Sequence, residues 1–170
     1  KPEESLKSYD EAIKVNPNYA DAYYNRGSLK TRTEKNDDAL KDFDTAIKLN
    51  PKDAASYNNR GVVKRKLNCN VGALSDFTIA IKLNPEDIIA HTNRGHLKKR
   101  FFDSKGAEED FQTAINVAEG SPLLIREIEL ESQMTAVIPT KAVETTPIAY
   151  TDAPADLNKA LRMPKVSKET

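Results

Sequence analysis

The stretch "AYYNRGSLK" at residues 22–30 returns twice along the chain, as "SYNNRGVVK" at 56–64 and as "AHTNRGHLK" at 90–98. Each copy follows the previous one by the same interval of 34 residues. A fixed period of this length is typical of repeat proteins, in which every repeat is one small supersecondary unit. The fold of the chain is therefore the fold of this unit, stacked several times.

A second stretch repeats with the same period. "DALKDFDTAIKLNPKD" at 38–53 reappears as "GALSDFTIAIKLNPED" at 72–87 and, with more changes, as "GAEEDFQTAINVAEGS" at 106–121. The opening "ESLKSYDEAIKVNPN" at 4–18 is the same half-unit without its first half. We therefore expect the sequence to begin inside a repeat and to be a fragment of a longer protein, with the number of earlier repeats left open.

The apolar pattern of each 34-residue unit predicts two helices of about a dozen residues. Ala39, Phe43, Ala46 and Ile47 have the i, i+4, i+7, i+8 spacing that places apolar side chains on one helix stripe. The second helix is predicted to end at Asn-Pro, because proline lacks the amide that a continuing helix needs. Acidic residues follow the proline, where the N-terminus of the next helix favours negative charge. They are Asp53, Glu86 and Asp87.

A glycine lies inside the first helix of every unit, where it costs about 1 kcal/mol relative to alanine. Something must compensate for this cost. We expect that the missing side chain at Gly27, Gly61 and Gly95 lets a phenylalanine of the second helix pack closely against the first. These phenylalanines are Phe43, Phe77 and Phe111.

These positions resemble the tetratricopeptide repeat family over about residues 3–119. Counting from Ala20, the shared places are an aromatic near the start, glycine at the eighth, alanine at the twentieth and twenty-seventh, phenylalanine at the twenty-fourth and proline at the thirty-second. The matching residues are Tyr23, Tyr57, Gly27, Gly61, Gly95, Ala39, Ala73, Ala107, Phe43, Phe77, Phe111, Ala46, Ala80, Ala114, Pro51 and Pro85. The third unit departs from the pattern at His91, Glu108 and Glu119.

The resemblance implies an all-α fold, a right-handed superhelix of helix-turn-helix repeats whose first helices line a concave groove. The domain organisation then follows in order along the chain. We expect the second helix of a truncated repeat at 1–19, repeats at 20–53, 54–87 and 88–120, a capping helix at 121–136 and an extended Pro/Thr-rich tail at 137–170, with a short helix within 152–163.

The arginine of each Asn-Arg-Gly precedes an aspartate of the second helix by 16 residues. We predict that these residues form structural pairs between the two helices of a repeat, and a role of the arginines in partner binding is the alternative. The pairs are Arg26 with Asp42, Arg60 with Asp76 and Arg94 with Asp110. Lysine occupies the usually apolar eleventh place, where its stem is expected to cover apolar surface while the ammonium reaches water.

The asparagines Asn25, Asn59 and Asn93 fall at the sixth place, on the groove side that the resemblance implies. An amide offers both a donor and an acceptor to a peptide unit. The arrangement is similar to the asparagine ladder of O-linked N-acetylglucosamine transferase, which holds an extended peptide by its backbone. The alternative is that the asparagines are solvated or bonded within their own helix.

A second device of the family, the two-carboxylate clamp of co-chaperones, is not expected here. That clamp uses Lys, Asn, Asn, Lys and Arg at set groove places. The matching residues of this chain are Tyr24, Ser28, Asn59, Ile89 and Asn93, and only one of the five agrees.

Basic residues gather near the ends of the first helices, and residues 52–85 hold six basic against two acidic residues. Such a strip would attract an acidic peptide, and a solvated basic face is the alternative. The predicted partner-binding residues of the groove are Tyr24, Asn25, Arg32, Asn59, Arg65, Lys66, Asn93, His96, Lys99 and Arg100.

Composition excludes several other classes. The 170 residues carry zero net charge, which argues against nucleic-acid binding, and hold no apolar run long enough for a membrane span. The single cysteine, Cys69, favours a reducing compartment such as the cytoplasm. His91 and His96 lie on different helix faces and no catalytic, metal or cofactor motif is present.

The sequence therefore predicts a non-catalytic scaffold or adaptor that binds an extended or acidic segment of a protein partner and is anchored in a large complex through its tail. Two alternatives remain. One is the substrate-recruiting region of a larger enzyme, and the other is an architectural element of a cytoskeletal or ciliary assembly.

Overall fold

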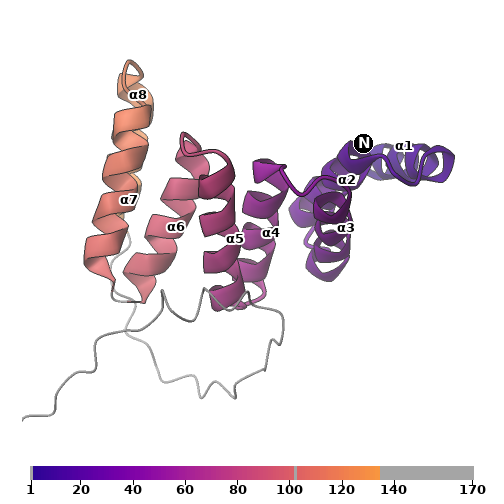
Figure 1. The fold of residues 1–170 in the computed structure, drawn as a ribbon, viewed down its shortest axis with the longest axis horizontal. Helices are drawn as coiled ribbons and strands as arrows, with labels where there is room; N and C mark the ends of the chain where they lie inside the picture. The colour runs from indigo at the N-terminus through magenta and orange to yellow at the C-terminus, as the bar shows by residue number, and fades with distance from the viewer. Residues whose placement is uncertain (1, 102, 135–170) are drawn as a thin grey trace, which may run out of the picture. The chain divides into compact units, whose positions relative to one another are not determined.

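The computed structural model describes residues 2–101 and 103–134, and over these residues the chain forms helices and turns with no strand. Each helix packs against the next one along the chain (Figure 1). The described part is thus an all-α solenoid of helix pairs, as predicted. The helices are α1 (Pro2–Val15), α2 (Ala20–Arg32), α3 (Asn36–Leu49), α4 (Ala54–Lys66), α5 (Asn70–Leu83), α6 (Ile88–Arg100), α7 (Ser104–Val117) and α8 (Pro122–Met134).

The first helices of successive repeats lie closer together than the second helices do. The most extensive contacts are within the pairs α2 with α3, α4 with α5 and α6 with α7. In addition, α2 contacts α4 and α4 contacts α6, whereas successive second helices meet less. Successive first helices are therefore direct neighbours.

Asparagine and aspartate side chains define the turns between repeats. Helices α3 and α5 end immediately before Asn50 and Asn84, and each asparagine Oδ1 accepts a hydrogen bond from the backbone N–H two residues later. Asp53 then caps α4 by accepting from two backbone N–H groups, and Asp87 caps α6 in the same way with one. The predicted helix ends and acidic helix starts are confirmed.

The close approach of glycine and phenylalanine is also confirmed. Phe77 is fully buried, and a Cβ built on Gly61 would lie 2.7 Å from its Cε1 atom. The corresponding distance to the nearest ring atom is 3.2 Å at Gly27 and 3.0 Å at Gly95. The glycines thus provide the space that the buried rings occupy.

Helix α8 continues the period of the first helices. The helices α2, α4, α6 and α8 begin at residues 20, 54, 88 and 122, so α8 stands where the first helix of a fourth repeat would begin. Its Ile128 is buried in one cluster with Phe111 and Ala114 of α7. The predicted tail at 137–170 and its short helix lie outside the described residues. None of the helices that the structure describes is long and apolar enough to cross a membrane.

Candidate functional site

One stripe of each first helix carries most of the predicted binding residues. Counted from the first residue of each first helix, the second, sixth, ninth and thirteenth places follow one another at intervals of four, three and four residues. These intervals place them on one side of a helix. We call the surface formed by these stripes the first-helix face. On α2 and α4 it consists of Asp21, Asn25, Ser28, Arg32, Ala55, Asn59, Val62 and Lys66. On α6 and α8 it consists of Ile89, Asn93, His96, Arg100, Leu123, Glu127 and Leu130.

The asparagines of this face connect successive first helices. The Asn59 Nδ2 group donates to Tyr24 Oη at 3.2 Å and to Ser28 Oγ at 3.4 Å, both on α2. The Asn93 Nδ2 group donates to Asn58 Oδ1 on α4 at 3.1 Å. Their own Oδ1 atoms accept no hydrogen bond from the residues that the structure describes. The two amides therefore stabilise the helix stack, and each keeps an oxygen that accepts from none of the described residues.

Asn25 behaves differently from the other two asparagines. It lies on α2 and is exposed, and it bonds to none of the described residues. Its equivalents, Asn59 and Asn93, are only partly exposed because each reaches back to the preceding first helix. The three predicted ladder residues therefore share one stripe of the solenoid but not one environment.

Two predicted groove residues are also structural. The Tyr24 ring packs edge-on against Phe43, with centroids 6.2 Å apart. The His96 ring does the same against Phe111 at 5.1 Å, and its Nε2 atom lies 3.2 Å from Glu131 Oε2 of α8. Both side chains thus contribute to packing between helices, and His96 is also part of the first-helix face.

Two lysines of the basic strip have partners within the chain. Lys66 Nζ lies 3.0 Å from Glu34 Oε1, and the hydrogen bond from Lys66 lowers the pKa of this exposed carboxyl below its ordinary value. Lys99 Nζ donates to the backbone carbonyl of Ser132 in α8. These lysines link neighbouring repeats.

The arginines of the strip are less engaged. Arg32 and Arg100 are exposed and pair with none of the described residues. Arg65 has its Nε atom buried without an acceptor in the described part of the chain. The predicted basic strip therefore retains positive charge without a partner among the described residues at Arg32, Arg65 and Arg100.

Away from this face, Arg60 binds residues of two second helices at once. Its Nε and Nη2 atoms donate to the two carboxylate oxygens of Asp76 on α5 at 2.9 and 2.7 Å. Its Nη1 atom donates to Asp44 on α3 at 2.8 Å. Because Asp76 is 1% exposed, this bidentate pair is largely shielded from water. Arg60 thereby joins three consecutive helices.

Arg26 makes the same contacts one repeat earlier. It bonds to both oxygens of Asp42, at 2.9 and 2.6 Å, and to Asp10 at 2.6 Å. Its pKa is raised above the ordinary arginine value, chiefly by the hydrogen bond to Asp42. The predicted pairs thus form, and each arginine has an additional partner in the preceding repeat that spacing alone had not suggested. A 34-residue spacing between Asp10 and Asp44 is the signal that would have found it.

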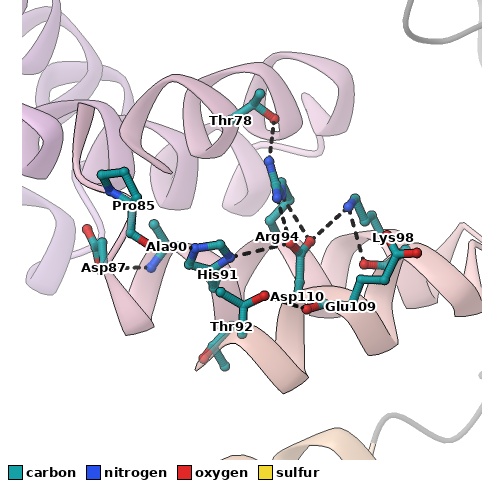
Figure 2. Close-up of polar contacts among 12 residues, drawn as sticks. Thr78, Pro85, Asp87, Ala90, His91, Thr92, Arg94, Lys98, Glu109 and Asp110 are labelled. Atoms are coloured by element: carbon teal, nitrogen blue, oxygen red, sulfur yellow. Dashed lines mark hydrogen bonds and ion pairs between the residues drawn. The ribbon is translucent and has the colours of Figure 1, made fainter. Parts of the chain in front are cut away.

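The third copy of this network differs in composition, as Figure 2 shows. Arg94 bonds to both oxygens of Asp110 at 2.9 and 2.6 Å, but its Nη1 atom meets the hydroxyl of Thr78, at 3.4 Å, in place of a carboxylate. His91 lies with Nδ1 at 3.4 Å from Asp110 and Nε2 at 3.0 Å from the Pro85 carbonyl. The network of the third repeat therefore has one carboxylate fewer than the other two.

The pKa of Asp110 reflects two opposing effects. Burial alone would raise the pKa of its carboxyl, because the charged form loses water. Hydrogen bonds from Arg94 and Lys98, together with their charges, outweigh burial and hold the pKa below its ordinary value. The folded state thus favours the ionised carboxylate.

The lysines of the eleventh place are a correction to the sequence prediction. Lys30, Lys64 and Lys98 are only 15–21% exposed, and their ammonium groups do not extend freely into water. Each lies 2.8–3.0 Å from the buried aspartate of its own repeat. A buried carboxylate with two oxygens has acceptor positions that one arginine leaves open, and the lysine occupies them.

The described residues offer several groups that can bind a ligand. Within 2–101 and 103–134 no group of three or more His, Cys, Asp or Glu side chains is arranged to hold a metal ion. The first-helix face supplies amide acceptors, two unpaired guanidinium groups and exposed apolar side chains. These are the groups with which a protein surface recognises a polypeptide.

Comparisons with known proteins agree with this description. The family model "TPR repeat" matches residues 1–32, and the model "Tetratricopeptide repeat" matches residues 20–53. No curated protein sequence matches the chain.

Similar solved structures include the MamA RS-1 ArsTM double mutant, with a TM-score of 0.64, 23% identity and coverage of 68% of this chain. This chain spans 65% of the length of that protein. The first TPR of Spaghetti (RPAP3), bound to the HSP90 peptide SRMEEVD, has a TM-score of 0.60 and 20% identity, and covers 67% of this chain and 90% of its own. The TPR2B-domain:pHsp70-complex of yeast Sti1 has a TM-score of 0.62 and 24% identity, and the match covers 67% of this chain and 93% of that one.

Proposed function

We propose, from the premise that this chain is a tetratricopeptide repeat protein, that it is a non-catalytic interaction module whose first-helix face binds an extended segment of a protein partner. The observation that carries the proposal is the alignment of Asn25, Asn59 and Asn93 on one face, with amide oxygens that remain free to accept from a peptide N–H. A ligand held by such groups is recognised through its backbone.

Two proteins of similar fold are described as complexes, one with an HSP90 peptide and one with pHsp70. In this chain the places of a carboxylate clamp hold different chemistry. Asn59 donates to both Tyr24 and Ser28, and Ile89 is an exposed apolar side chain. We infer that this face has a ligand other than a chaperone C-terminus.

The decisive experiment measures peptide binding to the purified chain and to a triple variant with Asn25, Asn59 and Asn93 changed to alanine. A random library of displayed 12-residue peptides serves as the probe. We expect enriched peptides to bind the native chain and to lose at least about 10-fold in affinity on the triple variant, because backbone hydrogen bonds to three amides are lost. Circular dichroism checks that the variant remains helical.

The matched control removes two amides from a second helix. Gln112 and Asn116 on α7 are exposed and bond to each other, so their replacement by alanine alters amide content without changing the first-helix face. Equal losses in the control and the triple variant, or no enriched peptide at all, would refute the proposed function.

We also propose that residues 137–170 anchor the module in a larger complex. The support is compositional: this segment is rich in Thr, Ala and Pro and has too few apolar residues for a core of its own. Cross-linking mass spectrometry on the native assembly compares Lys141 and Lys165 with Lys66 and Lys99. Cross-links from Lys141 and Lys165 to other subunits support anchoring by the tail. If neither lysine forms such a cross-link, this role is contradicted.

A further inference from the structure

The four stripes of the first-helix face differ in chemistry, and only the stripe of α6 combines an exposed apolar end with a free cation at the other end. Ile89 is 64% exposed at its N-terminal end, and Arg100 is exposed at its C-terminal end without a partner among the described residues. On α4 the corresponding residues are Ala55 and Lys66, and Lys66 is paired with Glu34. The α6 stripe is thus the most distinctive part of the face.

The apolar end of this stripe extends onto α8. Contacts between α6 and α8 join residues 35 apart, His96 with Glu131, and 33 apart, Lys99 with Ser132. An offset of about 34 residues therefore relates the places of α6 to those of α8. Ile89 and Leu123 are such a pair, and Leu123 is 80% exposed. Two largely exposed apolar side chains at corresponding places of neighbouring first helices are suited to one apolar residue of a partner.

The distance between the two ends sets the spacing of the groups that they recognise. Ile89 and Arg100 are 11 residues apart on one helix, so at about 1.5 Å per residue they are separated by about 16 Å along the axis. An extended peptide advances about 3.3 Å per residue and spans this distance with about five residues. The free oxygen of Asn93 lies between the ends, where it can accept from the peptide backbone.

We propose that the first-helix face selects an extended partner segment in which an apolar side chain and an acidic side chain are separated by about five residues. The apolar side chain lies on Ile89 and Leu123, and the acidic side chain pairs with Arg100. Charge complementarity decides for an acidic partner, because the guanidinium of Arg100 is exposed and pairs with none of the described residues. This inference rests on the proposed function and names its ligand class.

The test uses synthetic nine-residue peptides, acetylated and amidated so that they carry no terminal charge, with one Leu and one Asp separated by two to seven positions in a Ser/Thr background. Fluorescence anisotropy measures their affinity for the full chain. We expect the affinity to be highest at a separation of five and to decrease by about 5-fold or more at two or three. Replacing Asp by Asn in the best peptide should cause a similar loss that vanishes at high salt.

Variants locate the two contacts. Ile89→Ser should reduce the affinity about 10-fold, while Val71→Ser, at a side chain 65% exposed on the second helix α5, should not change it. Arg100→Ser should remove the preference for Asp over Asn, while Arg32→Ser, the same place on α2, should keep it. Because all four side chains are exposed, the fold should tolerate each change.

The outcomes separate this inference from the proposed function. A flat dependence on spacing, or an unchanged Asp preference in Arg100→Ser, overturns the inference even if the random library binds through the asparagines. If neither the spaced peptides nor the library bind, both the inference and the proposed function are wrong.

Discussion

At the scale of the residue, the arginine of each repeat is the clearest case of one side chain holding several helices. Arg26 and Arg60 each bind an aspartate of their own repeat and a second aspartate of the preceding one. The second partner of Arg94 is Thr78, whose hydroxyl is 3.4 Å away. A hydroxyl at this distance compensates less of the guanidinium charge than a carboxylate does.

Thr78→Asp should therefore stabilise the chain. The new carboxylate occupies the place of Asp10 and Asp44 and can approach Arg94, which is expected to add up to about 1 kcal/mol because the pair is partly exposed. Thermal unfolding followed by circular dichroism measures the shift, which should shrink in high salt. Thr45→Asp is the control, since Thr45 bonds only to the Lys41 carbonyl. A gain equal to that of the control would argue against the pairing.

Gly61→Ala should destabilise the protein although alanine favours helices. The added methyl group would lie 2.7 Å from the buried ring of Phe77, and such overpacking typically costs about 1–3 kcal/mol, more than the gain of about 1 kcal/mol in helix propensity. At Gly27 the nearest ring atom is 3.2 Å away, so Gly27→Ala should be close to neutral. Urea unfolding ranks the two variants, and a more harmful Gly27→Ala would contradict the packing argument.

At the scale of the element, the aspartate networks hold each second helix against its first. Asp76→Ala would leave Arg60 and Lys64 without their shared buried partner and should cost about 3–5 kcal/mol. The control, Asp44→Ala, removes a partner that is 56% exposed and should cost at most about 1 kcal/mol. Chemical denaturation of both variants distinguishes these values. Similar losses would mean that burial of Asp76 matters little.

The lowered pKa of Asp110 predicts a dependence of stability on pH. Because the folded state favours the carboxylate, its stabilisation is complete above the ordinary value of 3.8 and is lost as the pH falls through the lower pKa of the folded protein. Asp110→Asn should therefore make the decrease of unfolding free energy between about pH 5 and pH 2 shallower. Asp37→Asn, at an exposed position, is the control and should have a smaller effect on this slope.

At the scale of the whole molecule, the main contacts between the described helices run within a repeat or between adjacent repeats, so local damage should stay local. Ile128→Ala removes a buried contact between α8 and α7 and should cost about 2–4 kcal/mol. Hydrogen exchange should then accelerate in α7 and α8 and change little in α2 and α3. Leu130→Ala, at a side chain 48% exposed, is the control. Uniform acceleration over all helices would contradict this description.

Most of the fold followed from the sequence because its signals are local. The period of 34 residues, the Asn-Pro helix ends and the Gly-to-Phe contacts depend on short stretches of chain, and Gly61 and Phe77 show how directly a residue type reports a close contact. The candidate site was predicted less completely. Helical spacing placed Asn59 and Asn93 on the correct helices. It did not reveal that Asn59 donates to Tyr24 and Ser28 or that Asn93 donates to Asn58.

The sequence by itself determined the repeat, its two helices and the residues at each place, because these depend on periodicity and on the intrinsic preferences of Pro, Gly and Asp. Only the tertiary structure decided which of the charged and amide groups remain free. Lys30 and Lys66 are both predicted surface lysines, yet one pairs with buried Asp42 and the other with exposed Glu34. Such partners come from different helices, and their distances are set by helix packing, which no pattern within a single helix contains.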